Sequence, residues 1–147
     1  AAKAVAFHEA LQPTFKTYQH QIIKNAQTMA IALQDRGYRI VAGGTDNHLF
    51  IVDMRSKNTN GKVAELALQE AGITTSRSCI PFDPEKPWIT SGIRIGTPAV
   101  TTRGMQEKQI HMIVEFIDEA IINKDDNQKL ASIKSEVLKL CKEFPIY

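Results

Sequence analysis

A stripe of apolar side chains that recurs every three or four residues constrains the fold most. The stripe consists of Ala4, Phe7, Leu11, Phe15, Tyr18, Ile22, Ala26, Met29 and Leu33. This spacing occupies one face of an α-helix. Pro13 interrupts the stripe, and proline suits the first turn of a helix rather than its interior. The sequence therefore predicts two helices that meet at a bend, one ending near Leu11 and one covering residues 14–36, with Gly37 as C-terminal cap. The periodicity fits a connector between domains and an ordinary core helix equally well.

The remainder of the chain alternates short strands with helices. Runs of β-favouring residues predict strands at residues 38–42, 49–53, 73–78 and 89–95. Helices are predicted at residues 62–71, 105–123 and 128–143. After the strand at residues 89–95, the chain is predicted to begin a helix again at Thr101 or Thr102. Three prolines within residues 81–87 predict a loop. This order of elements predicts an α+β fold, a small α/β sandwich of one sheet packed on helices.

Length, charge, apolar runs and cysteine spacing indicate which classes of protein the sequence fits. The chain has 147 residues, which is typical of one domain. Its net charge of +2 comes from scattered basic residues, whereas a nucleic-acid platform needs a basic stripe. No apolar run is long enough to span a bilayer, and the first residues do not resemble a signal peptide. Cys79 and Cys141 have no metal or redox spacing, so we expect reduced thiols in a cytoplasmic protein.

Arg94 is the residue whose surroundings point most directly to chemistry. In a strand over residues 89–95, Ile93 and Ile95 face the core, and Arg94 shares the other face with Gly92 and Gly96. Two flanking glycines leave a guanidinium uncrowded, and its planar fork matches a carboxylate with two hydrogen bonds. The alternative is an arginine paired with a structural Asp or Glu. The residues by themselves favour this alternative and leave carboxylate binding open.

Several runs of sequence resemble one enzyme family, in the same order along the whole chain. They are Phe15-Lys-Thr-Tyr18-Gln, Asn25-Ala26, Gly43-Gly-Thr-Asp-Asn-His48-Leu, Ser91-Gly-Ile-Arg94-Ile-Gly-Thr-Pro98 and Thr102-Arg-Gly104. Together they are similar to serine hydroxymethyltransferases, pyridoxal-phosphate enzymes of the aspartate-aminotransferase fold type. The resemblance implies interconversion of serine and glycine, with transfer of a one-carbon unit to tetrahydrofolate. It also implies that residues 1–36 are connecting helices from a preceding large domain, and that residues 37–147 are the small C-terminal domain with a mostly antiparallel sheet.

The resemblance implies roles for particular residues. Arg94 matches the arginine that binds the α-carboxylate of the amino-acid substrate. Lys86, Pro87 and Trp88 match the loop that approaches the folate, where the flat ring of Trp88 either packs on the folate or covers the domain surface. Ser78 stands where the family usually has a folate-contacting asparagine, and its shorter hydroxyl puts that contact in doubt.

The cofactor is expected on another part of the enzyme. None of the lysines lies in the Thr-rich segment that carries the family's Schiff base, so no catalytic residue is predicted in this chain, and the chain alone is expected to be inactive. The helix already under way at Ala1, without a capping residue, leads us to expect a cut end. The resemblance implies a homodimer for the complete enzyme and allows a monomer for the chain alone. The alternative is a free-standing module that binds an amino acid without catalysis.

Other polar residues receive structural interpretations. His48 is predicted to be a hydrogen-bonding group in a turn, and Asp46 an Asx-turn residue. His8, His20 and His111 are predicted to lie on helix surfaces. Cys79 has only Arg77 beside it to favour a thiolate, so it is not predicted to be a nucleophile. No metal site is expected.

Overall fold

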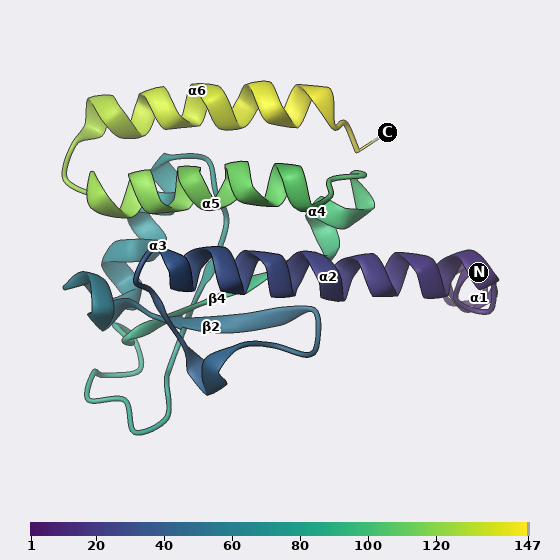
Figure 1. Cartoon of the computed structure of the whole chain (residues 1–147), viewed down its shortest axis with the longest axis horizontal. Helices are drawn as coiled ribbons and strands as arrows, with labels where there is room; N and C mark the ends of the chain where they lie inside the picture. Colours follow the sequence, from purple (N-terminus) through teal and green to yellow (C-terminus); the bar gives the residue numbers. More distant parts are fainter. Residues whose placement is uncertain (147) are drawn as a thin grey trace.

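A computed structural model describes residues 1–146 as a layer of helices packed on one face of an antiparallel sheet (Figure 1). The helices are α1 (Ala2–Ala10), α2 (Pro13–Asp35), α3 (Gly61–Glu70), α4 (Pro98–Thr102), α5 (Glu107–Ile122) and α6 (Asn127–Glu143). The strands are β1 (Arg39–Ile40), β2 (Leu49–Asp53), β3 (Ser76–Ser78) and β4 (Gly92–Gly96), in the order β1-β2-β4-β3. Two 3₁₀ turns, η1 (Val41–Gly43) and η2 (Met54–Lys57), flank β2. The predicted α+β class is confirmed.

The strands are shorter than the sequence predicts, and backbone conformation explains why. The predicted strand at 38–42 ends at Ile40 because Ala42 has a left-handed φ of 61°. The predicted strand at 89–95 begins only at Gly92, because Thr90 has a φ of 58° and its amide closes a turn onto the carbonyl of Lys86. The predicted strand at 73–78 pairs only over β3. The return to helix comes earlier than predicted, because Pro98 occupies the first turn of α4.

The core lies between the sheet and the helices α2, α3, α5 and α6. Phe50 and Val52 of β2 and Ile93 and Ile95 of β4 point into it. The second half of α2 contributes Met29 and Leu33 to the same cluster. Helix α5 lies at the centre of the helical layer and buries its stripe through Ile110, Val114 and Ile117. The sheet is thus closed on one face by helices, and the opposite face is left for other contacts.

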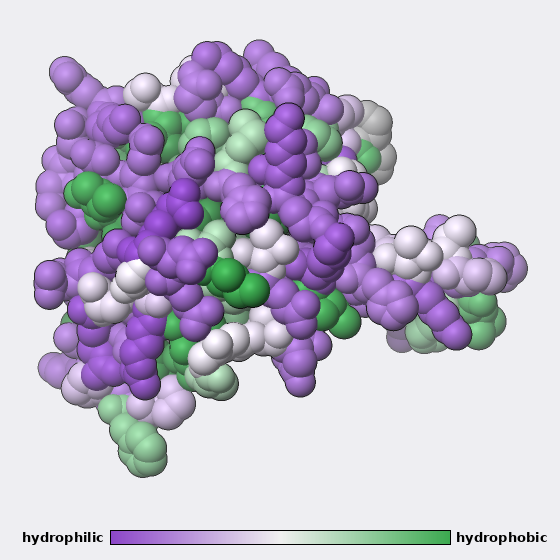
Figure 2. Space-filling view, viewed as in Figure 1, coloured by the Kyte–Doolittle hydropathy of each residue, from purple (hydrophilic) through white to green (hydrophobic). Residues whose placement is uncertain are grey.

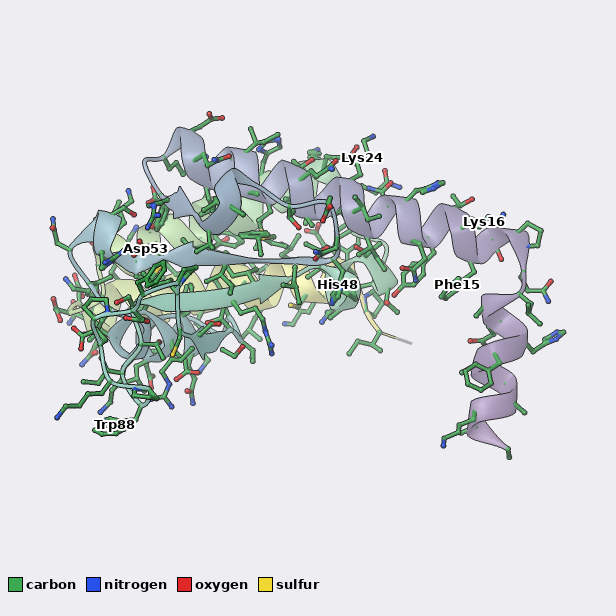
Figure 3. The ribbon with its side chains drawn as sticks, turned by 90° about the horizontal axis from the view of Figure 1, so that it is seen from below. Phe15, Lys16, Lys24, His48, Asp53 and Trp88 are labelled. Atoms are coloured by element: carbon green, nitrogen blue, oxygen red, sulfur yellow. The ribbon has the colours of Figure 1, made fainter. Side chains whose placement is uncertain are left out.

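The N-terminal part of the chain projects from this body as an arm, formed by α1 and the first turns of α2 (Figures 1 and 3). Helix α1 buries none of its residues. Val5, Phe7 and Leu11 are 57%, 68% and 83% exposed, and Figure 2 shows apolar surface on the arm. The apolar stripe therefore enters the core only from Ile22 onward. No helix of residues 1–146 is long and apolar enough to cross a membrane.

A buried amide fixes α2 to the segment that follows the sheet. Asn25 is fully buried, and its Nδ2 donates to Thr101 Oγ1 at 2.9 Å and to the carbonyl of Met105 at 3.0 Å. Its Oδ1 accepts from Gln21 Nε2 at 2.9 Å. Two turns earlier on α2, the hydroxyl of Tyr18 lies 2.7 Å from that of Thr102. The runs around Asn25 and Thr102 therefore act as a joint between helices.

Candidate functional site: the open face of the sheet

The open face of the sheet carries Arg94 near its middle. Arg94 of β4 lies opposite Ile51 in the neighbouring strand β2 and opposite Ser76 in the other neighbour, β3. Its side chain is exposed on the face of the sheet away from the helices. The residues around it form a hollow of about 460 Å³ lined by His48, Leu49, Thr74, Thr75, Ser76, Arg94 and Gly96. The predicted alternation of β4 is confirmed, since Ile93 and Ile95 are buried while Arg94 is not.

Arg94 differs from the other arginines in the contacts that its side chain makes with residues 1–146. Arg36, Arg39, Arg55 and Arg77 each form an ion pair with a carboxylate. Arg103 donates to the carbonyls of Phe144 and Cys141, at 2.6 and 2.7 Å. Within residues 1–146, Arg94 makes neither a salt bridge nor a hydrogen bond through its side chain. Within these residues, no structural Asp or Glu pairs with the exposed guanidinium.

The two glycines of β4 have different roles. A Cβ on Gly96 would make ordinary van der Waals contact with the carbonyl oxygen of His48, 3.4 Å away, so a methyl group fits at this position. A Cβ on Gly92 would approach the carbonyl oxygen of Ser78 to 2.8 Å and Cγ2 of Ile80 to 2.9 Å. The prediction that Gly92 leaves the arginine uncrowded is thus wrong, because Gly92 is required by packing against the next strand and loop.

A strained turn leads into β4. Thr90 is buried in the left-handed region, where its Oγ1 donates to the carbonyl of Gly92 at 3.0 Å and its own carbonyl accepts from the amide of Gly61 at 2.8 Å. A Cβ on Gly61 would collide with Thr90 Oγ1 and with the Gly92 carbonyl. A β-branched residue with positive φ persists only where the surroundings hold it in place. This turn therefore fixes the direction in which β4, and with it Arg94, leaves the loop.

The residues predicted to approach folate lie on and beside the loop 79–91. Lys86, Pro87 and Trp88 are exposed at its far end, with Lys86 Nζ 5.4 Å from the centre of the Trp88 ring. Trp88 is 63% exposed, so its ring extends into solvent and does not cover the domain surface. The guanidinium of Arg77 donates to the Trp88 carbonyl at 2.7 Å. In Figure 3, Trp88 and His48 lie toward opposite ends of the sheet.

Ser78 lies on the same face as Arg94. It is half-buried and pairs with Gly92, two residues before Arg94 on β4. At the usual rise of a strand, this separation is about 7 Å. Its hydroxyl has one long hydrogen bond of 3.5 Å, to the carbonyl of Cys79. The structure thus brings Ser78 near Arg94, whereas Lys86, Pro87 and Trp88 lie farther out on the loop.

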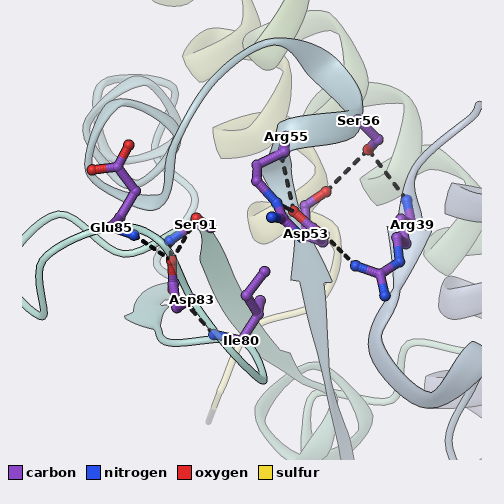
Figure 4. A network of polar contacts seen from close by, with 8 residues as sticks. All are labelled: Arg39, Asp53, Arg55, Ser56, Ile80, Asp83, Glu85 and Ser91. Carbon is purple, nitrogen blue, oxygen red and sulfur yellow. Dashed lines mark hydrogen bonds and ion pairs between the residues drawn. The ribbon is translucent and has the colours of Figure 1, made fainter.

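An aspartate that the sequence reasoning missed organises this loop. Asp83 accepts from the amides of Ile80 at 3.2 Å, Glu85 at 2.9 Å and Ser91 at 2.9 Å, and from Ser91 Oγ at 2.6 Å (Figure 4). Burial acts to raise the pKa of Asp83, but the hydrogen bonds, those from Ser91 first, outweigh it and lower the pKa to about 2. The position of Asp83 between Pro81 and Pro84 was the available signal, since aspartate often bonds nearby amides in turns.

A second carboxylate cluster, also missed, closes the end of β2. The Asp53 side chain is 2% exposed and accepts from Arg55 at 2.8 and 3.0 Å and from Arg39 at 2.6 Å (Figure 4). The hydrogen bonds from Arg55 lower the pKa of Asp53 to about 2, against the opposing effect of burial. This cluster fixes β1 and η2 to β2 and belongs to the scaffold.

The remaining polar predictions have mixed outcomes. Asp46 is not the turn residue, because Asn47 Oδ1 accepts from the amide of Leu49 at 3.0 Å, which makes Asn47 the Asx residue. His48 uses its backbone carbonyl, which accepts from Thr97 at 3.0 Å, while its side chain borders the hollow and makes no hydrogen bond within residues 1–146. The predicted structural role of its imidazole is therefore wrong. The surface positions of His8, His20 and His111 are confirmed, as are the free thiols. In the described part of the chain, no group of three or more His, Cys, Asp or Glu residues is placed to hold a metal.

Comparison with known proteins agrees with these features. The family model described as serine hydroxymethyltransferase matches residues 1–117, which contain the whole sheet and the loop 79–91. The chain belongs to the serine hydroxymethyltransferase family. A protein of Myxococcus xanthus (strain DK1622) with that name is 54% identical over 147 residues, and one of Legionella pneumophila (strain Corby) is 51% identical over the same length. Both alignments cover all of this chain and 35% of the relative, so the chain spans about a third of these proteins.

The hollow beside Arg94 does not have the groups that hold pyridoxal phosphate. A protein binds this cofactor through a Schiff-base lysine and an acidic or basic partner for the pyridinium nitrogen. The residues that line the hollow include neither a lysine nor a carboxylate. The residues of this hollow therefore do not by themselves fit the cofactor.

Proposed function

We propose that this chain forms one wall of the active site in a serine hydroxymethyltransferase that interconverts serine and glycine and passes a one-carbon unit to tetrahydrofolate. Arg94 binds the α-carboxylate of the amino acid. The observation that supports this role is the exposed guanidinium without a protein partner, set in a hollow on the open face of the sheet. A guanidinium forms two parallel hydrogen bonds with a carboxylate, each worth roughly 1.5–3 kcal/mol.

The role of Arg94 is orientation. A carboxylate held by two bonds cannot rotate freely, so the remaining bonds of the amino acid keep a fixed direction relative to the cofactor. Ser76 and His48 also line the hollow, beside Arg94. Positioning of this kind accelerates a reaction without any proton transfer by the arginine.

The folate contacts lie on the other end of the same face. Trp88 presents an exposed ring that is suited to packing on the flat rings of a folate, with Lys86 and Pro87 beside it. Ser78, between this loop and Arg94, offers a hydroxyl where the family usually has an amide. Its reach is shorter, so its contact with folate is the weakest of the four.

The rest of the catalytic machinery belongs to the remaining two thirds of the relatives' length. Pyridoxal phosphate, with its Schiff-base lysine, is placed there, and so is most of the homodimer interface. Residues 1–36 then connect the two parts and residues 37–147 form the small domain. Helix α1, which is exposed throughout, fits such a connection. We assign the enzyme to the cytoplasm.

The test is a chimaera in which this chain replaces the matching 147 residues of the Myxococcus xanthus relative. We expect the Arg94→Gln variant to raise the KM for serine about a hundredfold or more, because both charge-assisted bonds are lost. The matched control is Lys108→Gln, which removes the same charge from α5, on the opposite layer. A serine KM that stays within about twofold of the parent in Arg94→Gln would contradict the assignment.

A free-standing module that binds an amino acid is the second candidate, since residues of this chain alone form the hollow beside the exposed arginine. Titration calorimetry of the 147-residue chain with serine and glycine separates the two functions. Saturable binding that disappears in Arg94→Gln supports the module. Binding that requires the chimaera supports the enzyme wall.

A further inference from the structure

The loop 79–91 carries exposed side chains but is fixed from within. Its far end presents Phe82, fully exposed with a left-handed φ of 54°, and the 63% exposed Trp88. Figure 2 shows apolar surface protruding at this end of the molecule. Loops with such tips are usually mobile unless internal bonds hold them. In this loop four hydrogen bonds converge on a single carboxylate. Bonds from the amides of Ile89 and Thr90 to the Lys86 carbonyl, and from Arg77 to the Trp88 carbonyl, add to them.

The Asp83 carboxylate links three separate parts of the loop. One oxygen accepts from the amides of Ile80 and Ser91, at 3.2 and 2.9 Å, and the other from the amide of Glu85 and the hydroxyl of Ser91, at 2.9 and 2.6 Å. Ile80 lies at the start of the loop, Glu85 precedes Lys86, and Ser91 is the last residue before β4. All four donors therefore meet at one group (Figure 4).

Ser91 connects the loop to the sheet. It is fully buried, and its carbonyl accepts from the amide of Met54 at 2.9 Å. Arg94 follows three residues later on a strand that is bonded on both sides. The position of the loop relative to Arg94 is thus set through Asp83 and Ser91.

We propose that Asp83 is a positioning residue, which holds the loop 79–91 against the start of β4 and so sets the place of Trp88 and Lys86 relative to Arg94. This inference rests on the proposed function, and Asp83 itself touches no substrate. Four accepted hydrogen bonds require a group without a donor, and a carboxylate is such a group. An asparagine of the same shape would turn one oxygen into a donor that faces other donors.

The first experiment measures the loop without any substrate. Trp88 is the only tryptophan of the chain, so acrylamide quenching and anisotropy of its fluorescence report on this loop alone. We expect Asp83→Asn to increase the quenching constant about twofold, while Ser91→Ala, which removes one of the four bonds, gives a smaller increase in the same direction. The matched control is Asp35→Asn, at the exposed end of α2, which should leave quenching unchanged. Circular dichroism establishes that each variant is folded. If Asp83→Asn does not fold, the quenching of Ser91→Ala decides the test.

The second experiment uses the chimaera with the Myxococcus xanthus relative. We expect Asp83→Asn to raise the KM for tetrahydrofolate about tenfold, equivalent to one lost hydrogen bond, with the KM for serine within about twofold. Equal rises of both KM values, or unchanged Trp88 quenching in both variants, would overturn the proposal. Because the fluorescence measurement needs no ligand, it stands even if serine and folate prove not to bind, and that result would instead refute the proposed function.

Discussion

Replacing Asn25 by leucine, a side chain of similar size, tests how the long helix is joined to the domain. The change removes the donors to Thr101 Oγ1 and to the Met105 carbonyl, both in the interior. Each buried acceptor left without a donor costs about 1–3 kcal/mol, and the apolar leucine recovers about 1–2 kcal/mol through its own burial. At the middle of these ranges, two acceptors cost about 4 kcal/mol and burial recovers about 1.5 kcal/mol. We therefore expect the free energy of unfolding to fall by about 2.5 kcal/mol, a large share of the 5–15 kcal/mol of a typical domain.

Urea unfolding of the 147-residue chain, followed by circular dichroism, measures this loss. The matched control is Gln27→Leu on the same helix, where the amide is exposed and makes one hydrogen bond of 3.4 Å, to the carbonyl of Thr45. We expect the control to change stability by no more than about 0.5 kcal/mol. A loss below about 1 kcal/mol in Asn25→Leu, or equal losses in both variants, would refute the reasoning that buried acceptors make this joint costly to break.

Two further predictions concern the scaffold of the site. Gly61→Ala should destabilise the chain by about 1–3 kcal/mol, although alanine favours helices, because its methyl group meets Thr90 Oγ1. Gly96→Ala should be tolerated much better. Equal unfolding midpoints for the two variants would contradict this prediction. Arg55 and Lys24 hold the pKa values of Asp53 and Glu107 at about 2, below their ordinary 3.8 and 4.5. Because the folded-state pKa values are depressed, the stabilisation is complete above about pH 5 and is lost as the pH falls toward 2. In Asp53→Asn, the free energy of unfolding should decrease less steeply as the pH falls. A decrease as steep as that of the parent would contradict the stabilising role of the Asp53 carboxylate.

Periodicity predicted the helices well because it reflects contacts along one element. The stripe of α5 and the bend at Pro13 appear as expected, and the alternation of β4 placed Arg94 on the face away from Ile93 and Ile95. The strand ends were predicted less well. The left-handed turn at Thr90 is held by its contact with Gly61, far away in the sequence, and no local preference of a threonine indicates it.

The candidate site was predicted from sequence motifs, but the contacts that each of its residues makes within the chain could not be. The free state of Arg94 follows from where every other arginine finds its partner, which depends on the complete fold. The same is true of Asp83, whose donors come from three parts of a loop. Gly92 was interpreted as space for a ligand, although the neighbouring Ile80 fills that space.

The inner position of β4 divides the proposed site into two regions with different rates of motion. Its backbone is bonded to β2 and to β3, partners contributed by distant parts of the chain, so its amides exchange with solvent only when the whole sheet opens. The backbone that carries Arg94 is therefore held on both sides. Trp88, on a loop held by side-chain bonds, can move faster and at lower cost. In the proposed function, the amino acid would therefore meet the part of the site that the sheet holds, and the second substrate would meet the loop.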